Sequence, residues 1–225
     1  MIKNAIASVN NCQENESELK WNDEWTQYIR KEHSFRPELS YWDDRAYKYM
    51  KKDGNDPYEE SFYEMTRVKP GERVFDMGCG AGTMTIAFAQ KGHEVYGADF
   101  SSKMLERMME DAKTFGLDSL IHPIMLDWNE DWGMRELPLC EIVICSRALI
   151  FENLDESIRK LEGIAERRVC LGILDEIYDD RPGQSEIILN YLKARGIEPE
   201  FEEVRFRPGN ERRLDAIETL IAWDK

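Results

Sequence analysis

The segment that most constrains the fold is Val74–Thr85, a short apolar run that passes through an acid into closely spaced glycines. Gly78, Gly80 and Gly82 stand at alternate positions within it. Glycine adopts positive φ and lets another group approach the backbone, so this spacing predicts a loop that is pressed against a ligand. A helix predicted from Thr83 would direct its free N–H groups toward the same space. We therefore expect a strand, a binding loop and a helix, in that order.

The spacing of the glycines distinguishes between two kinds of nucleotide loop. A dinucleotide-binding loop reads G-x-G-x-x-G and holds a pyrophosphate at the helix N-terminus. Here Thr83 takes the place of the third glycine, and Asp76 stands two residues before the first. A carboxylate at that point repels a pyrophosphate and suits a cationic ligand such as S-adenosylmethionine, with its sulfonium and ammonium groups. The pattern therefore disfavours a nicotinamide oxidoreductase.

Two further predicted strands lead to acids. His93–Asp99 reads as a short buried strand ending in Asp99, which follows the first glycine by about 20 residues, the separation at which an acid binds ribose hydroxyls. The third predicted strand, His122–Trp128, reaches Asp127. Ligands of open α/β sheets bind beyond the carboxyl ends of the strands, so we expect these acids to converge there.

With these motifs the chain resembles the class I S-adenosylmethionine-dependent methyltransferases. The resemblance rests on Asp76–Thr83, Asp99–Ser101 and Asp127–Trp128, and it extends from about Tyr41 to the C-terminus in the order of strands and helices. It implies an α/β, Rossmann-like fold with a seven-stranded, mostly parallel sheet, helices on both faces and a closing antiparallel hairpin. It also implies methyl transfer from the sulfonium to a nucleophile by in-line displacement.

The residues expected to bind the cofactor come from the loop and from the ends of the strands. Phe100 is expected to lie against adenine, and the resemblance places the backbone at Ser146 against the methionine ammonium. Arg147 either holds a carboxylate of the cofactor or substrate, or pairs with Asp127. The complete predicted set is Asp76, Gly78, Cys79, Gly80, Gly82, Thr83, Asp99, Phe100, Met104, Asp127, Trp128, Ser146 and Arg147.

Each of these acids and aromatics also has a structural interpretation. Asp76 could satisfy loop amides, Asp99 and Asp127 could cap helices, and Trp128 could cover the sheet. One shared ligand explains acids at three successive strand ends more simply than three separate structural roles do. Ligand contact is therefore the favoured interpretation, above all for Asp99.

The chain divides near residue 68. Residues 1–68 predict an N-terminal helical cap or lid, whose polar beginning, to about residue 18, is expected to be flexible. Residues 69–225 alternate strands and helices, which predicts a parallel sheet and the S-adenosylmethionine-binding domain. Tyr41 and Trp42 in the cap are expected either to be core residues or to line the entrance for the substrate.

Acid–base groups are scarce in the sequence. His93 and His122 are expected to begin strands, far from the site, and His33 is expected to be exposed. Methyl transfer can proceed by positioning the nucleophile, so a missing base is compatible with this reaction. The candidates for a catalytic role are Tyr41, Arg147 and Glu176.

Charge and composition limit the partners. With 30 basic and 45 acidic residues the net charge is -15, which argues against a nucleic-acid partner. The segment Cys145–Ala148 also lacks the Asn/Asp-Pro-Pro-aromatic motif of enzymes that methylate base amines in this superfamily. A small-molecule acceptor is therefore predicted, with protein side-chain methylation or a non-catalytic nucleoside-binding module as alternatives. Unpaired cysteines and the lack of long apolar runs predict a cytoplasmic protein without membrane contact, and no metal site is predicted.

Overall fold

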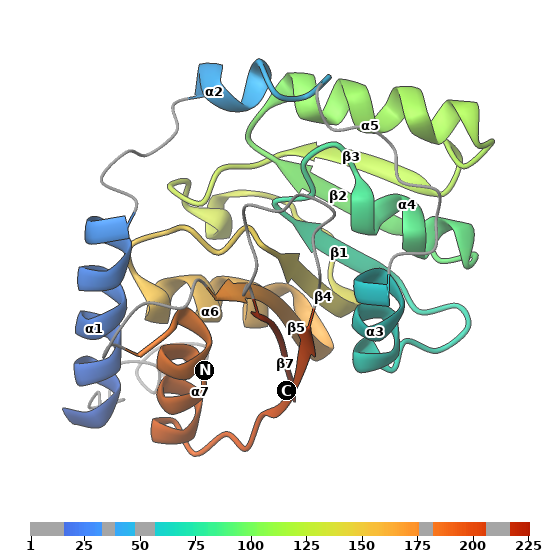
Figure 1. Cartoon of the computed structure of the whole chain (residues 1–225). Helices are drawn as coiled ribbons and strands as arrows, with labels where there is room; N and C mark the ends of the chain where they lie inside the picture. Colours follow the sequence, from blue (N-terminus) through green and yellow to red (C-terminus); the bar gives the residue numbers. More distant parts are fainter. Residues whose placement is uncertain (1–15, 33–38, 48–56, 176–181, 206–216) are drawn as a thin grey trace, which may run out of the picture.

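The computed structural model describes residues 16–32, 39–47, 57–175, 182–205 and 217–225. Its strands form one sheet of seven, in the order β3-β2-β1-β4-β5-β7-β6 (Figure 1). Neighbouring strands from β3 to β5 are parallel, whereas β7 runs antiparallel to both β5 and β6. The strands are β1 Val74–Met77, β2 Val95–Asp99, β3 Ile121–Met125, β4 Cys140–Ser146, β5 Ala165–Asp175, β6 Glu200–Arg205 and β7 Ile217–Asp224. The predicted fold class is confirmed.

Helices cover both faces of the sheet. The first face carries α3, α4 and α5, and the second carries α1, α6 and α7. The helices are α1 Glu16–Glu32, α2 Leu39–Asp43, α3 Pro57–Thr66, α4 Thr83–Gln90, α5 Ser102–Thr114, α6 Leu154–Ile164 and α7 Gln184–Ala194, with a short 3₁₀ turn at Trp132–Met134. Among the described helices, none combines the length and apolar composition that a membrane span requires.

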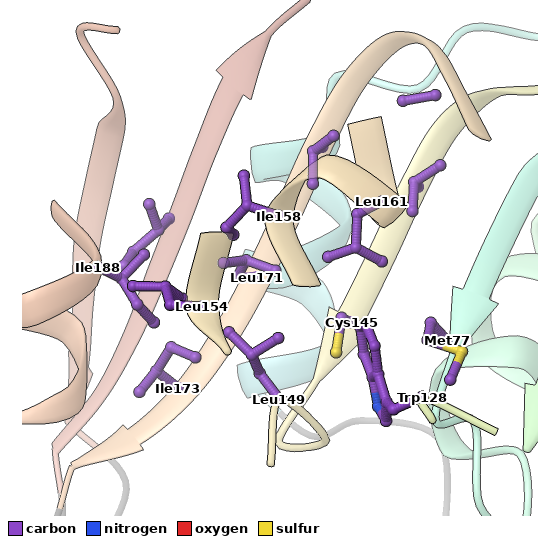
Figure 2. Close-up of a cluster of buried hydrophobic side chains, with 14 of the residues drawn as sticks. Met77, Trp128, Cys145, Leu149, Leu154, Ile158, Leu161, Leu171, Ile173 and Ile188 are labelled. Carbon is purple, nitrogen blue, oxygen red and sulfur yellow. The ribbon is translucent and has the colours of Figure 1, made fainter. Parts of the chain in front are cut away.

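The core on the second face forms between α6 and the central strands. Leu154, Ile158 and Leu161 recur at helical spacing, so they lie on one side of α6 and are fully buried there. Figure 2 shows Ile158 beside Leu171 of β5, Leu154 beside Ile188 of α7, and Trp128 beside Cys145 of β4. Burying each aliphatic side chain contributes roughly 1.5–3 kcal/mol to folding.

The first face depends on a glycine. Tyr58 and Phe62 of α3 are buried over Gly172 of β5, and a Cβ at Gly172 would stand 2.0 Å from the Tyr58 hydroxyl oxygen. Any larger residue at this position would collide with the Tyr58 and Phe62 rings, and the rings or α3 itself would have to move.

Two strands differ in their bounds from the prediction. β2 begins at Val95 rather than His93. β3 runs over Ile121–Met125 rather than His122–Trp128 and so ends before Asp127. The Asp127 carboxylate accepts hydrogen bonds from the backbone N–H and the side-chain amide of Asn129, at 2.8 and 2.7 Å, and such a local turn competes with continuation of the strand.

Helix α1 is fastened to the loop that follows β4. The Trp25 indole N–H donates to the Phe151 carbonyl at 2.8 Å, and the Thr26 hydroxyl donates to the Glu152 carbonyl at 2.9 Å. α1 also packs along α7 (Figure 1). The N-terminal helix is thereby joined to the carboxyl end of β4, the edge at which ligands of this fold class bind.

The aromatic pair of α2 is only partly buried. Tyr41 lies under the guanidinium carbon of Arg45, 3.5 Å from the ring centre, and Trp42 meets Tyr41 edge to face. Neither ring is a fully buried core residue, so the core interpretation is wrong for both. The substrate-entrance interpretation stays a prediction.

Candidate functional site

The loop between β1 and α4 has the backbone that its glycines predict. Gly78, Gly80 and Gly82 have φ values of 73°, 54° and 90°. The backbone N–H groups of Gly78 and Cys79 both donate to the Ala98 carbonyl of β2, at 2.8 and 3.0 Å. The loop is therefore fixed to the neighbouring strand, and α4 begins at Thr83 directly behind it.

The three glycines have different surroundings. A Cβ at Gly78 would stand 2.3 Å from the Ala148 Cβ, and one at Gly82 would stand 2.4 Å from the Met108 Cγ. At Gly80, among the described residues, only the Met104 sulfur comes within 4 Å, at 4.0 Å. Gly78 and Gly82 therefore leave no room for a side chain, whereas Gly80 has open space beside its backbone. Contact of all three glycines with the cofactor stays a prediction.

Asp99 is tied to this loop. One carboxylate oxygen accepts from the Gly80 N–H at 2.9 Å, and the other accepts from the Ser101 N–H at 2.9 Å. Burial raises the pKa of Asp99, and these amides oppose the rise. Each oxygen retains a further lone pair that can accept from a ribose hydroxyl.

Asp99 is not the cap of α5. The Ser101 hydroxyl accepts from the Met104 N–H at 3.2 Å and performs that role. The helix-cap alternative for Asp99 is therefore wrong, and ribose contact stays the prediction for this side chain.

Asp76 is buried beneath the loop. Its carboxylate accepts a 2.6 Å hydrogen bond from the Thr85 hydroxyl of α4. Burial, together with the nearby charge of Asp99, raises the pKa of Asp76 to about 7. Asp76 thus joins β1 to α4, and its direct contact with a cationic ligand stays a prediction.

Of the two predicted site residues that follow β3, Trp128 packs against its neighbours and Asp127 forms a turn. Trp128 is buried, and its indole N–H donates to the Ala148 carbonyl at 3.2 Å while its ring stacks on Trp132. Asp127 is partly buried and holds its own turn. Phe100 is partly buried after β2, and Met104 is fully buried next to Gly80.

Of the two predicted roles of Arg147, the structure does not show pairing with Asp127: the guanidinium forms an ion pair with Glu218 of β7. Binding of a cofactor or substrate carboxylate stays a prediction. Its φ of 56° lies in the left-handed region, and its backbone N–H donates to the Gly172 carbonyl at 2.7 Å. This turn directs the Arg147 side chain toward β7, which explains the change of partner.

A polar cluster around this ion pair was not predicted from the sequence. The Tyr58 and Ser146 hydroxyl oxygens are 2.6 Å apart, and the Arg147 guanidinium carbon lies 4.3 Å from the Tyr58 ring centre. Burial raises the pKa of Tyr58. Glu218 is only 3% exposed, and its second carboxylate oxygen is buried without a hydrogen-bond partner among the described residues. An acid inside the apolar run Ile217–Trp223 was the signal that could have indicated the cluster.

The other two catalytic candidates, Tyr41 and Glu176, stay predictions. Tyr41 lies beside Arg45, and Glu176 lies outside the described residues, as does His33. His93 meets the Tyr63 hydroxyl at 3.0 Å, and His122 pairs with Glu94 at 2.8 Å. Both histidines lie at the amino ends of β2 and β3, away from the glycine loop, as predicted.

Comparison with known proteins agrees with this geometry. Residues 74–162 match the family model described as a methyltransferase domain. An uncharacterized protein of Haemophilus influenzae is 30% identical over 183 residues, covering 75% of this chain and 67% of that protein. The magnesium-protoporphyrin O-methyltransferase of Synechocystis is 46% identical over 111 residues, covering 45% of this chain and 44% of that enzyme.

A solved structure shows the same fold. The crystal structure of magnesium protoporphyrin IX methyltransferase from Synechocystis with bound S-adenosylmethionine aligns with a TM-score of 0.58 at 18% identity, covering 96% of this chain and all of that one. Residues 74–162 are thus a methyltransferase domain, and the chain has the fold of the class I S-adenosylmethionine-dependent methyltransferases. S-adenosylmethionine is the cofactor of that family.

Proposed function

We propose that this protein transfers the methyl group of S-adenosylmethionine to a small-molecule nucleophile. The observation that carries the proposal is the open backbone at Gly80, beside a buried carboxylate, Asp99, that is fixed to the same loop. Bound there, the cofactor supplies an electrophilic methyl group on its sulfonium. The chain's own residues hold and orient the reactants.

Asp99 would accept hydrogen bonds from the ribose, because both of its oxygens are already oriented by backbone amides. Gly80 would let the adenosyl portion approach the main chain. The backbone at Ser146 would face the methionine portion, since β4 ends there beside β1. Rate enhancement would come chiefly from holding the nucleophile in line with the sulfonium.

Three observations support a small molecule as the acceptor. The Synechocystis relative is named for a porphyrin substrate. The net charge of -15 opposes a polyanionic partner. Helix α1 is fastened to the loop after β4, which supports residues 1–68 as a cap on the acceptor side of residues 69–225.

Calorimetry with S-adenosylhomocysteine tests the cofactor assignment. We expect the wild-type protein to bind it and Asp99→Ala to bind at least tenfold more weakly, about 1.4 kcal/mol or more. Asp118→Ala, which removes an equal charge at an exposed position, is the matched control and should stay within twofold of the wild type. Equal affinities for the three proteins would refute the ribose assignment.

The acceptor class needs a second experiment. Release of S-adenosylhomocysteine can be followed with fractionated small-molecule extracts, with a protein extract and with total RNA. Turnover that depends on the small-molecule fractions supports the proposal. Turnover confined to protein or RNA would overturn it.

A further inference from the structure

A chain of hydrogen bonds leads from α2 to the carboxylate assigned to the ribose. The Ser101 hydroxyl donates to an Asp43 oxygen at 2.7 Å, and the Ser101 N–H donates to Asp99 at 2.9 Å. Asp99 in turn accepts from the Gly80 N–H at 2.9 Å. Helix α2, which lies beside α5 (Figure 1), thus reaches the glycine loop through one buried serine.

The Ser101 hydroxyl uses both its proton and its oxygen in hydrogen bonds. A hydroxyl has one proton to donate, and this proton goes to Asp43, while the oxygen accepts from the Met104 N–H at 3.2 Å. Ser101 is completely buried, and the Asp43 side chain is 19% exposed. Removing the Asp43 acceptor would leave a buried hydroxyl without its partner, and Ser101 would then turn or shift to recover one.

Such a shift would reach Asp99 because the two residues are separated by one position. The Asp99 carboxylate is held on one side by Gly80 and on the other by Ser101. Movement of the Ser101 backbone releases one oxygen and changes the direction in which the carboxylate faces. A hydrogen-bonding group misplaced by about 1 Å loses much of its effect on a bound ligand.

We propose that Asp43 is a positioning residue for cofactor binding, which fixes the Asp99 carboxylate through Ser101 and so makes docking of α2 part of the cofactor site. This inference rests on the proposed function, in which Asp99 binds the ribose. Lys103, 3.7 Å from Asp43, helps to hold Asp43 in place.

Binding of S-adenosylhomocysteine to a set of variants tests the role. We expect Asp43→Ala to raise the Kd at least fivefold. Asp43→Asn keeps an oxygen that accepts the Ser101 proton and should stay within twofold of the wild type. Asp44→Ala, an exposed neighbour with the same change of charge, is the control and should also stay within twofold.

A double-mutant cycle shows whether Asp43 acts through Ser101. If it does, Asp43→Ala with Ser101→Ala binds no more weakly than Ser101→Ala alone. Additive losses, or an Asp43→Ala protein within twofold of the wild type, would overturn the proposal. Thermal unfolding without ligand should show Asp43→Ala still folding cooperatively, with a somewhat lower Tm than Asp44→Ala because the buried Ser101 hydroxyl has lost its acceptor.

Asp99→Ala, measured beside these variants, separates the two proposals. An unchanged Kd for Asp99→Ala refutes the ribose assignment of the proposed function. A weakened Asp99→Ala protein together with an unchanged Asp43→Ala protein refutes the positioning role alone.

Discussion

Gly78 of the binding loop lies directly against Ala148, the second residue after β4, so that a Cβ at Gly78 would stand 2.3 Å from the Ala148 Cβ. The Ala148 carbonyl also accepts the Trp128 indole N–H at 3.2 Å. The loops that follow β1, β3 and β4 therefore support one another at the carboxyl edge of the sheet. This contact gives Gly78 a requirement for small size in addition to its positive φ.

Gly78→Ala should therefore cost more stability than the φ angle alone explains. The left-handed backbone costs roughly 1–2 kcal/mol, and relieving the collision with Ala148 adds roughly 1–3 kcal/mol. Gly92→Ala is the matched control, because Gly92 has a φ of 90° and nothing among the described residues within 4 Å of an added Cβ. Urea unfolding of the two variants should show a clearly larger loss for Gly78→Ala, and equal losses would contradict the packing role.

The ion pair between Arg147 and Glu218 gives a second prediction. Glu218 is 3% exposed, so Arg147→Ala would leave a buried carboxylate without its charged partner. Because the Arg147 side chain is itself 38% exposed, solvent reduces the cost to about 2 kcal/mol.

Two comparisons sharpen this test in chemical unfolding. Lys91→Ala breaks an exposed pair with Glu60 and should cost less than about 1 kcal/mol. Replacing both members, as Arg147→Met with Glu218→Leu, should recover most of the loss, since no charge is then buried. If the double variant is less stable than Arg147→Ala, an unpaired buried charge is not the cause.

The order of strands and the binding loop could be predicted because their signals are local. Glycine spacing, apolar runs and acids at strand ends lie within short segments, and β1, α4 and β4 follow them closely. The partner of Arg147 could not be predicted, because it lies 71 residues away on a strand that inserts between two others. For Asp127, the turn that its own side chain forms overrode the apolar pattern that precedes it.

The contact between Asp43 and Ser101 is of the same long-range kind, since 58 residues separate them. Their residue types gave a partial signal. Serine is a favoured residue for capping a helix, but capping uses only the oxygen of the hydroxyl. The group that accepts the Ser101 proton depends on which element docks beside it. The sequence therefore indicated the residues of the glycine loop better than residues such as Asp43, which support the site from another part of the chain.

The raised pKa of Asp76 predicts a pH dependence of stability. The pKa lies near 3.8 in an unfolded chain and about 7 in the folded protein, mainly because of burial. Between these values the folded state retains a proton that the unfolded state has lost, so stability falls as the pH rises, by about 1.4 kcal/mol per pH unit at most. Above about pH 7 both states are ionised, and the loss levels off.

Asp76→Asn isolates this contribution, because the amide oxygen can still accept from the Thr85 hydroxyl but does not titrate in this range. Urea unfolding from pH 5 to 8.5 should show the variant gaining stability relative to the wild type as the pH rises to about 7. Asp118→Asn, at an exposed position, should give a difference from the wild type that hardly changes with pH. If the Asp76→Asn and wild-type curves run parallel instead, Asp76 is already ionised in the folded protein at pH 5, and its burial is offset by a donor beyond Thr85.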